Sequence, residues 1–87
     1  MRRIEKKTWP YLFDKVLSGE KQFDLRIAEF ECEIGDTLVL REWDPEKKEY
    51  TGRELEKEIT FLVKTKDLKF WSQEDINELG FLVMSLK

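Results

Sequence analysis

Histidine is absent from this 87-residue sequence, and Cys32 is its only cysteine. A single thiol excludes an intrachain disulfide and a thiolate metal cluster, and without histidine the chain has no imidazole for catalysis or for a zinc site. No apolar run approaches the roughly 20 residues that a membrane-spanning helix needs. Nor does an apolar segment follow the basic start Arg2–Lys7, as it would in a signal peptide. We therefore expect a cytoplasmic protein without a metal, a cofactor or a membrane partner.

The charge of the chain is abundant but nearly balanced. Sixteen basic and 19 acidic residues give a net charge of −3, and charged residues make up 40% of the sequence. This balance argues against a protein that coats nucleic acid through a broadly basic face, although it leaves room for a local basic pocket. The length suits one domain, residues 1–87, with a small core.

The pattern of apolar residues predicts one helix near the N-terminus, over residues 10–18. Proline is favoured in the first turn of a helix, where Pro10 stands, and Gly19 suits the position after its end. The apolar residues between them recur at helical spacing and would share one face of the helix: Trp9, Leu12, Phe13, Val16 and Leu17.

After this helix the pattern changes to the period of two that is typical of strands. Ser72 followed by two acids also predicts a short helical turn over residues 72–78. Gly52 is expected to form a bulge or a bend, and the run 81–86 is apolar on both faces, which predicts a buried central strand. The expected strands cover residues 23–27, 37–43, 53–64 and 81–86, with 2–7 as a further candidate.

One helix followed by several short strands predicts a small α+β domain whose sheet closes into a barrel of about five to six strands. The phenylalanines Phe13, Phe23, Phe61 and Phe81 are expected in its core, because so small a domain needs large apolar groups. Trp43 and Tyr50 flank a polar connection and are candidates for stacking on bases, whereas the sequence leaves Trp9 and Trp71 undecided.

The most informative stretch is residues 19–26, which we call the signature segment. Lys21, Asp24 and Arg26 lie within six residues of one another, and in a strand Asp24 and Arg26 would share a face. One interpretation is a surface ion pair worth about 0–1 kcal/mol. The other is a pocket in which Arg26 holds a phosphate or a base edge through its planar fork, Asp24 orients it or accepts from the ligand, and Lys21 supplies a second cation.

The signature segment reads G-x-K-x-x-D-x-R, and this pattern resembles the signature of the ASCH domain family, small relatives of the PUA fold. Further motifs in the same order extend the resemblance over nearly the whole chain, closest to a short uncharacterised branch: Ile34-Gly35-Asp36, Leu40–Asp44, Tyr50–Arg53 and Gly80–Leu86. The resemblance implies a PUA-like β-barrel with a cleft beside the helix, in a superfamily whose members are proposed to bind RNA.

One branch that resembles this sequence hydrolyses the acetyl amide of a modified cytidine with a lysine, a threonine and a glutamate. Lys21 matches that lysine, but Asp24 occupies the position of the threonine. A carboxylate cannot simply replace a hydroxyl nucleophile. Thr51 or Thr37 could compensate only if the fold brought its hydroxyl beside Lys21.

Glu42 could face either side of its strand, and the sequence does not decide between them. An inward carboxylate would need a partner, which Arg26, Lys21 or Arg53 could supply. In that case Glu42 would join the signature residues in a polar cluster with perturbed pKa values.

We therefore expect a domain that recognises RNA or a nucleotide. The expected ligand-binding residues are Lys21, Asp24, Arg26, Glu42, Trp43, Tyr50 and Arg53. One alternative is a small metal-independent amidohydrolase acting on an acylated nucleoside, with Lys21 as the base and Asp24 or Glu42 as the acid or water-activating group. A second alternative is a protein-interaction module.

Overall fold

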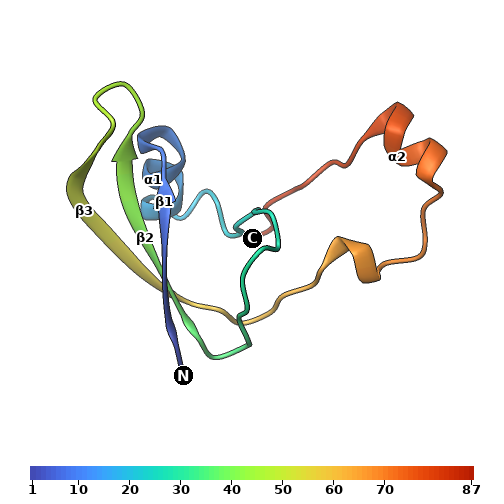
Figure 1. Cartoon of the computed structure of the whole chain (residues 1–87), viewed down its shortest axis with the longest axis horizontal. Coiled ribbons are helices and arrows are strands. Elements are labelled where there is room, and N and C mark those ends of the chain that lie inside the picture. The colour runs from blue at the N-terminus through green and yellow to red at the C-terminus, as the bar shows by residue number, and fades with distance from the viewer.

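The computed structural model describes residues 1–87 and shows a small sheet with one helix, from which an extended limb projects (Figure 1). We call residues 59–87 the C-terminal limb. The elements in chain order are β1 (Arg3–Thr8), α1 (Pro10–Leu17), β2 (Thr37–Asp44), β3 (Glu49–Glu58), the 3-10 helix η1 (Thr65–Asp67) and α2 (Gln73–Leu79).

The three strands form one mixed sheet in the order β1-β2-β3. β1 runs parallel to β2, with Thr8 opposite Glu42, and β3 runs antiparallel to β2, with Leu55 opposite Leu40. Because parallel strands end at the same edge of a sheet, the chain leaves β1 and enters α1 close to the end of β2. This edge carries most of the polar side chains described below.

Helix α1 covers one face of the sheet, and its contact with β2 forms the core. Phe13 and Val16 of α1 pack against Leu40, and Leu38 and Leu55 flank this cluster. Burying such a side chain contributes about 1.5–3 kcal/mol each. Pro10 stands at the start of α1, and Gly19, just beyond its end, has the left-handed φ of 87° that glycine tolerates. The prediction of a helix here is confirmed.

A bulge in β3 shapes the sheet beside α1. Between the pairs Arg41–Glu54 and Trp43–Tyr50, the three residues Thr51, Gly52 and Arg53 lie opposite the single residue Glu42. Gly52 has a φ of 100°, a left-handed conformation that a side chain would oppose. The bulge predicted at this glycine is therefore confirmed, and it directs two side chains of β3 toward one carboxylate.

Asp36 joins the start of β1 to the turn before β2. Its carboxylate accepts a hydrogen bond from the backbone N–H of Arg2 at 3.0 Å and another from that of Glu33 at 2.8 Å. Asp36 is buried, and these two backbone donors hold the pKa of its carboxyl below the usual range. The turn itself contains Gly35, whose φ of 98° is the left-handed conformation that glycine tolerates.

Several other predicted elements are confirmed. The candidate strand near residues 2–7 is β1, and the strand expected at 37–43 is β2. The helical turn expected at 72–78 is α2, whose capping residue Ser72 accepts a hydrogen bond from the N–H of Asp75 at 3.1 Å.

The predicted barrel is wrong, because the sheet is open and has three strands rather than five or six. Three strands are too few to close. Both free edges also carry many charged side chains, a composition that discourages further strands from pairing. These residues are Arg3, Glu5, Lys6 and Lys7 on β1 and Glu54, Glu56, Lys57 and Glu58 on β3.

Two predicted strands are absent, and a third is shorter than expected. Residues 23–27 and 81–86 form no ladder, and the strand expected to reach residue 64 ends at Glu58. In the first case side-chain hydrogen bonds of the signature segment replace the ladder, as described below. Of the four phenylalanines expected in the core, Phe13 is buried and Phe23 is half-buried, whereas Phe61 and Phe81 are exposed.

The C-terminal limb extends away from the sheet and then returns toward it (Figure 1). Neither η1 nor α2 makes an extensive contact with the sheet or with α1. The returning chain is held to the signature segment by a hydrogen bond of 2.9 Å from the N–H of Gln22 to the hydroxyl of Ser85. The radius of gyration, 14.7 Å, exceeds the value of about 12 Å that a compact domain of this length would have.

No helix of the structure has the length and apolar character that crossing a bilayer requires.

Candidate functional site

The signature segment lies across the end of β1, and Arg26 attaches it there. The guanidinium donates from Nη1 to the backbone carbonyl of Lys7 at 3.1 Å and from Nη2 to the hydroxyl of Thr8, also at 3.1 Å. It also donates to the carboxylate of Asp24, from Nε at 2.5 Å and from Nη2 at 3.3 Å.

Arg26 is therefore committed to contacts within the protein. All three of its nitrogens donate to Asp24 or to the end of β1, and its side chain is 23% exposed. The planar guanidinium of Arg26, which could have bound a phosphate, instead fixes the backbone of the signature segment. In this arrangement Arg26 and Asp24 position their neighbours, and Lys21 is the member of the motif that lines a groove beside α1.

The ammonium of Lys21 is largely withdrawn from solvent. Its Nζ donates to the backbone carbonyl of Phe23 at 2.7 Å and lies 3.8 Å from Oδ1 of Asp24, and its side chain is 14% exposed. Burial lowers the pKa of Lys21, the positive charge of Arg26 lowers it further, and the carboxylate of Asp24 opposes both effects. A partly desolvated amine of this kind is typical of functional sites, where it can bind an anion or transfer a proton.

Lys21 lines a groove of about 290 Å³ between α1 and the signature segment. Both hydrophobic and charged side chains line it: Tyr11, Leu12, Lys15, Glu20, Lys21 and Phe23. The second lysine of the groove, Lys15, is paired with Glu20 at 3.0 Å. The groove lies near the lower end of the size range of ligand pockets, and it combines two aromatic rings with the ammonium of Lys21, whose ion pair with Asp24 is 3.8 Å long.

Glu42 points inward, toward α1, which resolves the alternative that the sequence left open. Its carboxylate accepts hydrogen bonds from the hydroxyl of Thr51 at 2.5 Å and from Nε and Nη2 of Arg53 at 2.8 and 2.7 Å. These bonds, those from Arg53 first, lower the pKa of Glu42 to about 2, although burial opposes the shift. Glu42 is therefore a paired carboxylate in a satisfied site, and it does not have the raised pKa of a general acid.

Arg53 connects this buried carboxylate to α1. Its Nη2 also donates to Asp14 at 2.8 Å, and its guanidinium lies 4.7 Å from the centre of the Phe13 ring. The cluster of Glu42, Thr51, Arg53 and Asp14 thus holds α1 against β2 and β3. Its role in this structure is to position the helix that forms one wall of the groove.

The two polar clusters adjoin at Thr8 but do not merge. Thr8 is buried, accepts from Arg26 and lies opposite Glu42 across the two parallel strands. Glu42 makes no hydrogen bond to Lys21 or Arg26. Sequence reasoning did not identify Thr8 as a site residue, because a threonine directly before Trp9-Pro10 indicates a helix cap.

Trp43 and Tyr50 lie on the other face of the sheet. Since side chains alternate along β2, Trp43 points away from the face that Leu40 and Glu42 share. The rings of Trp43 and Tyr50 meet edge to face at 5.0 Å. Lys7 lies 3.8 Å from the centre of the Trp43 ring, and Arg41 lies 3.9 Å from that of Tyr50. The seven residues expected to bind one ligand are therefore divided between two faces.

No hydroxyl is hydrogen-bonded to Lys21, whose polar neighbours are the carbonyl of Phe23 and the carboxylate of Asp24. Thr51 bonds to Glu42, and Thr37 lies at the first position of β2. The structure thus gives Lys21 no threonine nucleophile to activate.

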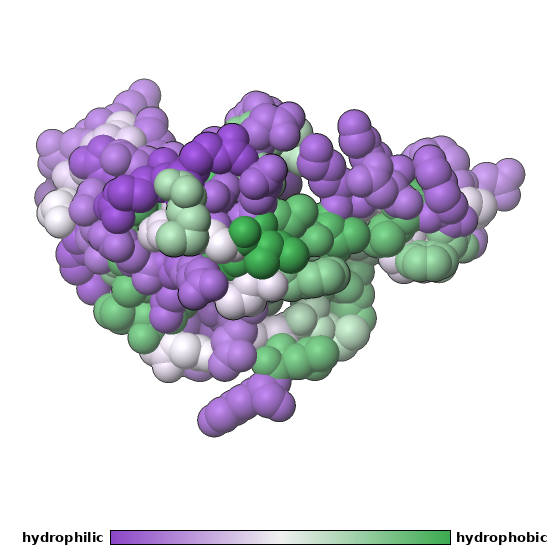
Figure 2. Space-filling model, turned by 90° about the horizontal axis from the view of Figure 1, so that it is seen from below, coloured by the Kyte–Doolittle hydropathy of each residue, from purple (hydrophilic) through white to green (hydrophobic).

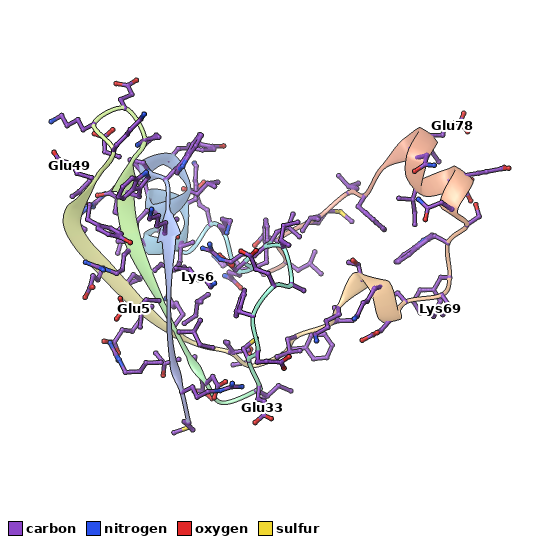
Figure 3. All side chains as sticks on the ribbon, viewed as in Figure 1. Glu5, Lys6, Glu33, Glu49, Lys69 and Glu78 are labelled. Carbon is purple, nitrogen blue, oxygen red and sulfur yellow. The ribbon has the colours of Figure 1, made fainter.

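The irregular chain between α1 and β2 is also held to β1 by an aromatic contact. Lys6, labelled in Figure 3, points from β1 toward this chain, and its Nζ lies 3.8 Å from the centre of the Phe30 ring. Such a contact contributes about 0.5–1 kcal/mol where it is exposed.

Comparison with known proteins shows the family of the chain but no activity. Residues 5–81 match the profile of a domain of unknown function, DUF3850. An uncharacterised 12.9 kDa protein in the GpA 3' region of Escherichia phage P2 is 39% identical over 62 residues, which are 71% of this chain and 52% of that protein. The chain therefore spans about half the length of this relative. No solved structure matches.

Proposed function

We propose that this chain, which belongs to the DUF3850 family, binds a nucleotide or a short single-stranded stretch of RNA in the groove between α1 and the signature segment. The observation that carries the proposal is the position of Lys21, a partly desolvated cation that lines the groove together with the aromatic residues Tyr11 and Phe23. A base can stack on an aromatic ring while its phosphate meets the ammonium.

The proposed division of labour follows from the contacts of each side chain. Lys21 supplies the positive charge for a phosphate. Tyr11, which is 71% exposed, and the half-buried Phe23 offer ring surfaces on which stacking is worth about 1–3 kcal/mol per base. Arg26 and Asp24 act through Lys21, because they hold the segment that presents it.

A net-acidic chain is compatible with this function. Recognition of single-stranded RNA depends mainly on unstacked bases and hydrogen bonds to their edges, so it needs one well-placed cation more than a broadly basic face. The net charge of −3 would disfavour non-specific binding to duplexes and so leave recognition to the groove.

Kinship with the ASCH family and a cytoplasmic location are part of the same proposal. The kinship rests on the residues Gly19, Lys21, Asp24 and Arg26 and on the position of the groove beside the helix that precedes them. Trp43, Tyr50, Glu42 and Arg53 do not line this groove, so the proposal assigns direct contact with the ligand to Lys21 and the aromatic rings.

Calorimetric titration tests the proposal. The probes are the four ribonucleoside monophosphates, the corresponding nucleosides and short single-stranded RNAs, added to the wild-type chain and to two variants. We expect binding that Lys21→Ala weakens at least about tenfold, which corresponds to about 1.4 kcal/mol. Lys15→Ala is the matched control, because Lys15 lines the same groove but is already paired with Glu20.

Two outcomes would contradict the proposal. No heat with any probe would favour a protein-interaction module. Release of free acid from an acylated nucleoside, lost in Lys21→Ala and unaffected by a chelator, would instead support the amidohydrolase, with Lys21 as its base.

A further inference from the structure

The C-terminal limb exposes most of its large apolar side chains. Figure 2 shows them as a green band that extends from the middle of the molecule into the limb. The exposed fractions of Phe61, Phe70 and Leu82 are 76%, 77% and 80%. The other exposed members of this surface are Val63, Trp71, Leu79, Phe81, Val83, Met84 and Leu86.

This exposure contrasts with the composition of the chain. Hydrophobic residues make up 40% of the sequence, yet only Phe13, Val16, Val39 and Leu40 are buried. The run 81–86, apolar on both faces, has the sequence of a buried strand, yet its apolar side chains are between 44% and 80% exposed. Its burial therefore requires a surface from outside the single chain.

The exposed area is sufficient for a stable interface. An aromatic side chain can bury 150–250 Å², so the four aromatic and six aliphatic residues of the limb expose on the order of 1,000 Å². A standard interface needs about 800 Å² from each partner, whereas the largest apolar patch on a typical monomer is about 300–600 Å². The limb thus resembles one half of an interface.

The charges of the limb point to the identity of the partner. Residues 59–87 contain four lysines and four acidic residues, which gives a net charge of zero. Association of two limbs would consequently meet no net repulsion, although each whole chain carries −3.

The charges are also separated along the limb. Lys64, Lys66 and Lys69 lie around η1 together with one acid, Asp67, whereas Glu74, Asp75 and Glu78 lie on α2. Figure 3 labels Lys69 before α2 and Glu78 near its far end. A two-fold axis exchanges the two ends of a self-complementary surface, so it would place the lysines of one copy opposite the acids of the other.

We propose that a second copy of this chain covers the C-terminal limb, and that the two limbs pack around a two-fold axis. The apolar residues form the centre of the interface, and the lysine and acid groups pair at its rim. The charged edges of β1 and β3 remain outside it. No residue of the limb lines the groove at Lys21. The limb does touch the neighbouring Gln22 through Ser85, so dimerisation and nucleotide binding are measured in separate experiments.

Light scattering after size exclusion tests the proposal on the whole chain. Between about 1 and 100 µM, a range that brackets a micromolar Kd, we expect the mass to reach twice the 10.5 kDa of one chain. Leu82→Glu would bury a charge at the interface and raise the Kd of the dimer about tenfold or more. Leu17→Glu is the matched control, because Leu17 is exposed on α1, and it should leave the Kd unchanged.

A pair of charge reversals tests the two-fold arrangement. Lys69→Glu and Glu78→Lys each place like charges opposite one another in a dimer of identical variants, so each alone should be more monomeric than the wild type. In a mixture of the two variants both pairs are again of opposite sign, and the heterodimer should form with nearly the wild-type Kd.

Three results would overturn the proposal. The first is a wild-type chain that stays at 10.5 kDa throughout this range. The second is an equal effect of Leu82→Glu and Leu17→Glu on the Kd. The third, a failure of the mixed variants to restore association, would exclude the two-fold pairing of the charged groups.

Discussion

Arg26 donates a hydrogen bond from Nη2 to the hydroxyl oxygen of Thr8 at 3.1 Å, and this bond joins the signature segment to the last residue of β1. Thr8 lies opposite Glu42 in the parallel pair of strands. The contact therefore places the segment that presents Lys21 directly beside the cluster that holds α1. Both walls of the groove depend on this edge of the sheet.

Thr8→Val tests this contact, because valine keeps the shape of threonine and removes the acceptor. Thr8 is buried, so the loss should lower the free energy of unfolding by about 1 kcal/mol. Urea unfolding measures the change, and Thr60→Val, at an exposed threonine of the limb, is the control. Equal midpoints for Thr8→Val and the wild type would mean that the bond does not hold the segment.

Lys21 should matter more for binding than for folding. The ammonium of Lys21 is partly desolvated, which costs free energy in the folded state. Lys21→Ala removes this desolvation penalty together with the contacts to the carbonyl of Phe23 and to Asp24, so we expect a melting temperature close to that of the wild type. The affinity for a nucleotide should nevertheless fall at least about tenfold. A variant that unfolds, with its ligand affinity per folded molecule intact, would show that Lys21 is structural.

The lowered pKa of Lys21 predicts a pH dependence of binding. A phosphate is attracted only by the charged ammonium, so the affinity should decrease as the pH rises through a pKa that lies below 10.5. Stability should change in the opposite sense. In that window the unfolded chain binds more protons than the folded chain, so the contribution of Lys21 to stability increases with pH.

Lys21→Arg is the control for this pH dependence, because an arginine stays charged across the whole range. The variant should bind with an affinity that is independent of pH in this window. A profile identical to that of the wild type would assign the titration to another group.

Glu42→Gln should destabilise the fold by about 2 kcal/mol, because it removes the charge that accepts from Thr51 and Arg53 inside the sheet. Glu54→Gln is a suitable control, since its side chain is 49% exposed and the change should stay within about 0.5 kcal/mol. Comparable losses in the two variants, measured by urea unfolding, would contradict a special role for Glu42.

The lowered pKa of Glu42 also predicts how the stability of the protein responds to acid. Its folded pKa of about 2 lies below the ordinary 4.5. The stabilisation from Glu42 is therefore complete above pH 4.5 and is lost as the pH falls toward 2. Thermal unfolding between pH 6 and pH 2 should show a shallower loss of stability in Glu42→Gln than in the wild type. If the stability of the two proteins fell in parallel with pH, the loss could not be assigned to protonation of Glu42.

The elements that the sequence predicted correctly are those with local signals. The proline and glycine that bound α1, the glycine in the bulge of β3 and the serine cap of α2 each act within a few residues, so spacing and residue type were sufficient. The grouping of Lys21, Asp24 and Arg26 is equally local, and the structure does bring these three together.

The arrangement of the sheet depended on long-range pairing, which the pattern of residues does not encode. Residues 23–27 alternate as a strand does, but Arg26 satisfies the end of β1 with side-chain bonds, and the segment stays irregular. Residues 81–86 are apolar enough for a central strand, yet they pair with neither edge of the sheet, because the edge strands β1 and β3 are highly charged. The partners of Glu42 likewise became clear only from the bulge that turns Thr51 and Arg53 toward it.

The central claim, that a nucleotide occupies the groove beside Lys21, is tested most directly by mapping backbone NMR shifts during a titration with the tightest-binding monophosphate. We predict that the largest changes occur at Tyr11, Lys21 and Phe23, which line the groove. Changes centred instead on Trp43 and Tyr50 would place the ligand on the other face of the sheet and contradict the claim.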